Sequence, residues 1–155
     1  MLKVVIRIFI IVCIVSGFVS CKQSKPDLKK TLFSVVMKKR GSEDRVMVSL
    51  NELTDFQWQR MFIFAPYTPI QKIHKSLGFE WDRAEKTNVH MRDDICLLVF
   101  VSNNQVVQYF EYPRNHGDFS EIHVERGFAP SEALFEVVEA ERGESWLVFA
   151  VIKDR

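Results

Sequence analysis

The sequence predicts an α+β domain in which a mainly antiparallel sheet of about five or six strands packs against one or two helices. Two observations indicate this class: apolar runs of strand length dominate the second half of the chain, and two earlier segments have helical spacing. A hydrophobic content of 47%, with 13 Phe, supplies enough apolar surface for one core. We therefore expect a single domain over 28–155.

The first helix is expected over 28–40, because its apolar residues share one helical face. These residues are Leu28, Leu32, Val35 and Val36. Basic side chains occupy the last turn, and Gly41 follows as a stop signal. Strands are expected next over 45–50, where apolar and polar residues alternate, and over 60–64. A loop or single helical turn joins them.

The strongest local signal is the run Thr-Pro-Ile-Gln at 68–71, which predicts the start of a second helix. Thr68 and Gln71 would form a capping box, and Pro69 suits the first helical position. Gly78 is placed to end this helix. We expect it to cover one face of the sheet, with the first helix beside it.

Two hairpins are expected in the second half of the chain. Apolar runs over 95–101 and 106–112 flank Asn103-Asn104, and asparagine tolerates the positive φ values of a tight turn. Runs over 134–139 and 146–152 flank Arg142-Gly143 in the same manner. Short connections of this kind join antiparallel strands.

Residues 1–20 have the order of an export signal. Lys3 and Arg7 precede an apolar stretch over 8–15, and small residues follow before Cys21. The apolar stretch is too short to cross the roughly 30 Å of bilayer hydrocarbon. A permanent transmembrane helix is therefore the less favoured alternative.

The run Phe18-Val19-Ser20-Cys21 resembles the bacterial lipobox, although Phe18 stands where leucine is usual. The resemblance implies that Cys21 is diacylated and becomes the N-terminus of a lipoprotein, with 21–27 as a tether. Ordinary signal cleavage that leaves a free Cys21 is the alternative. In a Gram-negative cell, Lys22 after the cysteine would imply the outer membrane, facing the periplasm. In a Gram-positive cell the outer face of the plasma membrane is implied.

Charge and cysteine content exclude some classes of function. The formal net charge is +1, and two cations lie in the expected signal, so we expect no nucleic-acid partner. Of three cysteines, Cys13 lies in the signal and Cys21 would carry lipid. Cys96 remains, and its apolar neighbours predict a buried side chain rather than a reactive thiol.

The sequence contains no phosphate-binding loop, CxxC pair, GxSxG elbow or HExxH helix, and it indicates no catalytic residue, metal or cofactor. Its most polar run holds Arg114, His116 and Asp118, just after an expected strand. A solvated loop ordered by an Arg–Asp pair is the favoured interpretation. The alternative is a hydrolase or a metal site at this loop. The candidate metal ligands are His90, Asp93, Asp94, His116 and Asp118.

Aromatic residues cluster around the strand at 60–64 and should mostly belong to the core. Trp58 and Trp81 adjoin polar residues in expected loops, so we expect them to be partly exposed. With Tyr67, they are candidates for binding a protein partner, because exposed aromatic side chains are frequent anchors at interfaces.

The run 56–68, with Leu77-Gly78 after it, resembles a motif of small, uncharacterised bacterial envelope lipoproteins. The helix and following hairpin are also loosely similar in topology to lipoproteins that assist outer-membrane assembly. Neither resemblance implies an activity. We therefore expect a lipid-anchored, non-enzymatic binding or structural protein of the cell envelope. Its partners would be the membrane, through the lipid, and an envelope protein, and the sequence does not indicate an oligomeric state.

Overall fold

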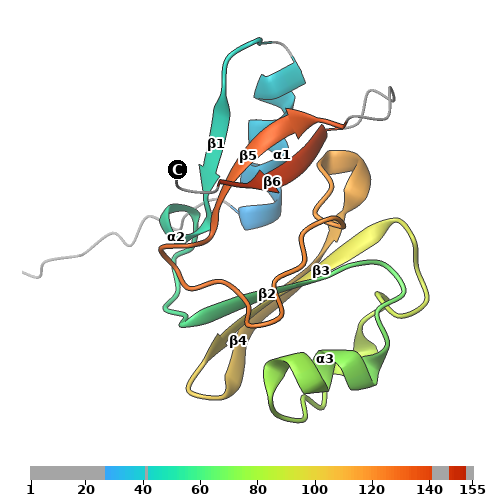
Figure 1. The fold of residues 1–155 in the computed structure, drawn as a ribbon. Coiled ribbons are helices and arrows are strands. Elements are labelled where there is room, and N and C mark those ends of the chain that lie inside the picture. Colours follow the sequence, from blue (N-terminus) through green and yellow to red (C-terminus); the bar gives the residue numbers. More distant parts are fainter. Residues whose placement is uncertain (1–26, 41, 141–146, 153–155) are drawn as a thin grey trace, which may run out of the picture.

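The structure is a computed structural model that describes residues 27–40, 42–140 and 147–152 (Figure 1). The expected signal over 1–20 and the lipidation site Cys21 lie outside these residues, as does the tether except for Asp27. Within the described residues, no helix has both the length and the apolar character needed to cross a membrane.

In the described residues, six strands form two antiparallel sheets of three strands each (Figure 1). One sheet has the order β1-β5-β6, with bounds Val46–Ser49, Leu134–Glu139 and Leu147–Val151. The other has the order β2-β3-β4, with bounds Arg60–Phe64, Ile95–Ser102 and Gln105–Pro113. The α+β class and the antiparallel pairing are confirmed. The division into two sheets differs from the single expected sheet, because a strand pattern does not reveal which distant strands pair.

The first helix, α1, spans Leu28–Arg40 as predicted. Leu32 and Val36 are fully buried in a core shared by both sheets, and α1 packs against β1 and β5. The sequence analysis placed α1 beside the second helix, and this expectation is wrong. The two helices contribute to different cores and lie at opposite ends of the molecule (Figure 1).

The second long helix, α3, spans Ile70–Leu77 and packs on the β2-β3-β4 sheet through Ile73 and Leu77. Gly78 ends it with φ of 79°, and its N–H donates to the carbonyl oxygen of His74, as predicted. The predicted capping box is wrong. Pro69 occupies the N-cap position, so Thr68 lies one residue too early, and its hydroxyl donates to the carbonyl oxygen of Ala65 instead.

Three short helical turns complete the described part of the fold. These are α2 (Leu50–Leu53), η1 (Ala84–Lys86) and η2 (Arg114–His116). α2 begins at Leu50, the residue at which the strand over 45–50 was expected to end. The hairpin of β3 and β4 is confirmed, with φ of 50° at Asn103 and 56° at Asn104. The pairing of β5 with β6 is also as predicted, although the connecting residues 141–146 lie outside the described part of the chain.

Strand β3 is buried on both faces, which explains its unbroken apolar sequence. One set of its side chains enters the core between the two sheets, and the other enters a second core under α3. The first set is Cys96, Leu98 and Phe100, and the second is Ile95, Leu97, Val99 and Val101. β4 is the outer strand next to β3, so its far edge borders the surface.

Candidate functional site

The polar loop selected from the sequence is organised around an ion pair between Arg114 and Asp118. Arg114 donates from Nε and Nη2 to Oδ2 of Asp118, at 2.9 and 2.6 Å, and from Nη1 to the carbonyl oxygen of Asp93. The Arg–Asp pair is therefore as expected. The loop is less solvated than expected, because Asp118 is only 6% exposed.

The Asp118 carboxylate has further donors within the fold. The Ser120 N–H donates to Oδ1 at 2.8 Å, and the Ser120 hydroxyl donates to Oδ2 at 3.0 Å. Burial opposes ionisation of this carboxyl group, but the hydrogen bonds from Arg114 and Ser120 outweigh it and hold its pKa below the ordinary value. Asp118 is therefore a charged group satisfied by protein donors.

The same loop ties the two sheets together. The Asp118 N–H donates to the carbonyl oxygen of Leu147, and the Phe149 N–H donates to the carbonyl oxygen of Asp118, which joins the loop to β6. From β3 in the other sheet, the Cys96 thiol lies 3.7 Å from Oδ1 of Asp118. A network in this position stabilises the packing of one sheet on the other.

Cys96 is fully buried, as predicted. Burial, with a smaller effect from the nearby Asp118 charge, raises the pKa of its thiol to about 12. The thiol is therefore protonated at neutral pH and serves as a weak S–H donor to Asp118. A thiol in this state is a poor nucleophile.

His116 contributes to packing rather than to the Asp118 network. Its imidazole lies against the Phe33 ring of α1, with ring centroids 4.3 Å apart, and its carbonyl oxygen accepts a hydrogen bond from the Tyr112 hydroxyl. Within the described residues, no three His, Cys, Asp or Glu side chains lie close enough together to hold a metal ion. The candidate ligands His90, Asp93, Asp94, His116 and Asp118 thus do not gather into one site.

The candidate aromatic residues differ in exposure from the prediction. Trp58 is 6% exposed and Trp81 is 8% exposed, so the expectation of partly exposed indoles is wrong. Their polar neighbours face the solvent while each indole turns inward. Trp58 donates from Nε1 to the Thr54 hydroxyl at 3.0 Å, and Trp81 packs edge-on against Tyr109. Tyr67 is 60% exposed, with φ of 58°.

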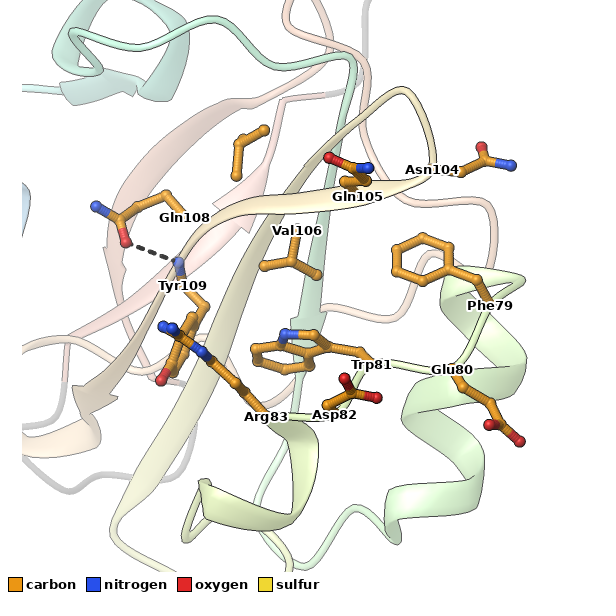
Figure 2. A pocket seen from close by; sticks show the side chains of 11 residues that line it. Phe79, Glu80, Trp81, Asp82, Arg83, Asn104, Gln105, Val106, Gln108 and Tyr109 are labelled. Atoms are coloured by element: carbon orange, nitrogen blue, oxygen red, sulfur yellow. Dashed lines mark hydrogen bonds between the residues drawn. The ribbon is translucent and has the colours of Figure 1, made fainter.

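Trp81 nevertheless forms the floor of a surface hollow, which we call the edge groove (Figure 2). It has a volume of about 490 Å³ and is lined by residues 79–83 and by residues 104–109 of the β3–β4 hairpin. The side chains of Val106 and Tyr109 complete its apolar floor (Figure 2). Its rim carries the exposed charges of Glu80, Asp82 and Arg83.

A second hollow lies on the other face of the same sheet, and we call it the helix groove. It has a volume of about 380 Å³ and is lined by residues 27–29 at the start of α1, residues 53–56 and residues 108–110 of β4. The ammonium group of Lys29 lies 5.9 Å from the centre of the Phe110 ring. Both grooves are lined by Gln108 and Tyr109, so they flank one short stretch of β4.

The sequence did not single out the β4 residues that line these grooves. Val106, Gln108 and Tyr109 were part of an expected strand, but their importance depends on β4 being the outer strand of its sheet. The asparagine turn before β4 was the available signal, because it fixes which residues begin the outer strand.

Comparison of the chain with models of known protein families, with curated proteins and with solved structures found no match.

Proposed function

We propose that this chain is a lipid-anchored binding protein of the bacterial cell envelope that holds a protein partner at the edge groove. The observation that carries the binding role is the combination of an aromatic floor and a charged rim in one open hollow. Aromatic surface with a polar rim is the usual composition of a protein interface.

The rigidity of the groove floor supports this role. Trp81 and Tyr109 pack edge-on with ring centroids 4.8 Å apart, and both rings belong to or border the core under α3. A floor already fixed by the fold loses little conformational entropy when a partner binds. The volume of about 490 Å³ is enough to accept several side chains of a partner.

The polar loop supports a structural role for the Arg114–Asp118 pair. Both groups already have partners within the fold, and those partners join β3 to β6. We therefore assign the loop to stability and the edge groove to binding.

The anchor is proposed from the sequence of residues 1–21. Acyl chains stabilise membrane attachment by about 0.8 kcal/mol for each buried CH₂, and two or more chains give stable anchoring. Cell fractionation tests this. The wild-type protein should sediment with membranes, and Cys21→Ala should release it. Cys13→Ala is the matched control and should stay membrane-bound, whereas a Cys21→Ala protein that still sediments with membranes would refute the anchor.

Site-specific photo-crosslinking in intact cells tests the groove. A photoreactive residue at Val107, which lines the edge groove and is 45% exposed, should form a discrete crosslinked product with a partner protein. The control position is Met47 on β1 of the other sheet, which has a similar exposure of 51%. Equal crosslinking from both positions, or none from Val107, would contradict a binding role for the groove.

A further inference from the structure

We infer that the partner binds as an extended strand added to the outer edge of β4, with its side chains entering the edge groove and the helix groove alternately. This inference rests on the proposed binding function and names the form of the partner. The occupant is an extended segment of another protein, with apolar residues at alternate positions and lysine or arginine among them.

The exposed edge of β4 is the first observation. Within the described part of the chain, β4 pairs with β3 alone, so the backbone groups on its other side pair with no neighbouring strand. Natural edge strands are usually protected by charges or proline. In β4 these appear only towards the end, at Glu111 and Pro113, and the central run 106–110 has neither. The register shift leaves Val107 as an extra residue opposite Phe100 and Val101, so the regular edge open to a partner strand begins at Gln108.

A hydrogen bond on this edge marks where a partner carbonyl would bind. The backbone N–H of Tyr109 donates to Oε1 of the Gln108 side chain at 3.1 Å. An amide has one hydrogen, so this bond directs it away from β3 and towards the open side. The exposed Gln108 side chain thus supplies the acceptor that the carbonyl oxygen of an added strand would replace.

The two grooves match the alternation of an added strand. Tyr109 packs with the core under α3 on the side of the edge groove, whereas Phe110 packs with the core between the sheets on the side of the helix groove. Successive side chains of a strand point to opposite faces of the sheet. A strand paired with 108–110 would therefore place successive side chains in one groove and then in the other.

The charges around the grooves indicate the chemistry of the occupant. Carboxylates outnumber cations in both linings: Glu80 and Asp82 accompany Arg83 in the edge groove, and Asp27 and Asp55 accompany Lys29 in the helix groove. A segment with net positive charge fits this balance. A second copy of β4 fits it less well, because Gln105–Pro113 contains one glutamate and no basic residue. The charge balance therefore favours a segment of a different protein.

The test uses the full-length lipidated protein in mild detergent and a phage-displayed library of random twelve-residue peptides as the probe. Selected peptides should carry apolar residues at alternate positions and net positive charge. In the complex with a selected peptide at 100 times its Kd, exchange of the Tyr109 amide hydrogen should slow by about a hundredfold. The Phe110 amide lies on the β3 side of the strand. The factor by which the peptide slows its exchange should be far smaller than the factor at Tyr109.

Two substitutions separate strand addition from simple contact with the groove. Gln108→Ala removes the competing acceptor and should tighten peptide binding by about twofold to tenfold. A peptide that merely lay in the groove would bind this variant equally or more weakly, since Gln108 lines both hollows. Glu80→Lys should weaken binding by about threefold to tenfold at low salt. Glu85→Lys is the matched control, because Glu85 is also exposed but lines neither groove, and its effect should be about twofold at most.

Several results would overturn the inference. These are a failure of the library to yield binders, selected peptides without alternation or positive charge, and unchanged exchange at Tyr109. A protein that sediments as a dimer with its own Tyr109 amide protected would identify a second copy as the occupant and would also refute it. Crosslinking from Val107 without protection of Tyr109 would leave the groove as a binding site and remove strand addition alone. Absence of crosslinking would remove the proposed function itself.

Discussion

Replacing Asp118 with alanine should lower the free energy of unfolding by about 3 kcal/mol. Removing one partner of a buried ion pair costs about 3–5 kcal/mol, and in Asp118→Ala the Arg114 guanidinium loses its two hydrogen bonds to the Asp118 carboxylate. The Arg114 side chain is 28% exposed, so water can solvate part of the remaining guanidinium charge, which places the expected loss near the lower end of that range. The bonds from Ser120 are lost in the same variant.

Urea unfolding followed by tryptophan fluorescence measures this effect. With an m-value of about 2 kcal/mol/M, the midpoint should fall by about 1.5 M. Asp94→Ala is the control, because Asp94 also forms an ion pair with an arginine, but that pair with Arg92 is exposed to solvent. Its midpoint should hardly change, since exposed ion pairs contribute little.

Either of two results would contradict this prediction. A midpoint for Asp118→Ala within error of the wild-type value would show that the network does not stabilise the packing of the two sheets. An equal loss in Asp94→Ala would show that burial of the pair does not decide its contribution.

Four further predictions concern the same region and the end of α3. The folded protein holds the pKa of Asp118 below its ordinary value, so the charged carboxylate stabilises the fold at neutral pH. This stabilisation is lost as the pH falls below about 4. The urea midpoints of wild type and Asp118→Asn should therefore converge in acid. Cys96 should resist alkylation by iodoacetamide in the native protein at pH 8 and react only after unfolding, as mass spectrometry would show. Gly117→Ala should lower the free energy of unfolding by at least about 3 kcal/mol, because φ is 119° and the added Cβ would lie 2.6 Å from the Phe149 ring. Gly78→Ala, also at positive φ but with open space around it, should cost only about 1 kcal/mol in the same urea titration.

The features predicted correctly from the sequence are those determined by neighbours in the chain. The bounds of α1, the strand at Arg60–Phe64 and the turn at Asn103-Asn104 all follow from local spacing and turn chemistry. The Thr68 capping box failed by one residue, because the helix begins after Pro69 rather than at it.

The features that the sequence could not show depend on distant contacts. β1 pairs with β5 near the other end of the chain, and this pairing divides the strands between two sheets. Polar neighbours suggested that Trp58 and Trp81 were partly exposed, but the direction of each indole is set by the sheet against which its loop packs. The grooves exist because β4 lies at an edge, which no local pattern reveals.

The position of β3 has a consequence for how the molecule unfolds. Its consecutive residues alternate between the two hydrophobic cores, so separating the strand from either core disturbs the other. The two cores should therefore melt as one cooperative unit, with the slowest native-state hydrogen exchange in β3. A ligand that holds β4 in place would then slow opening on both sides of the sheet, including residues far from the groove.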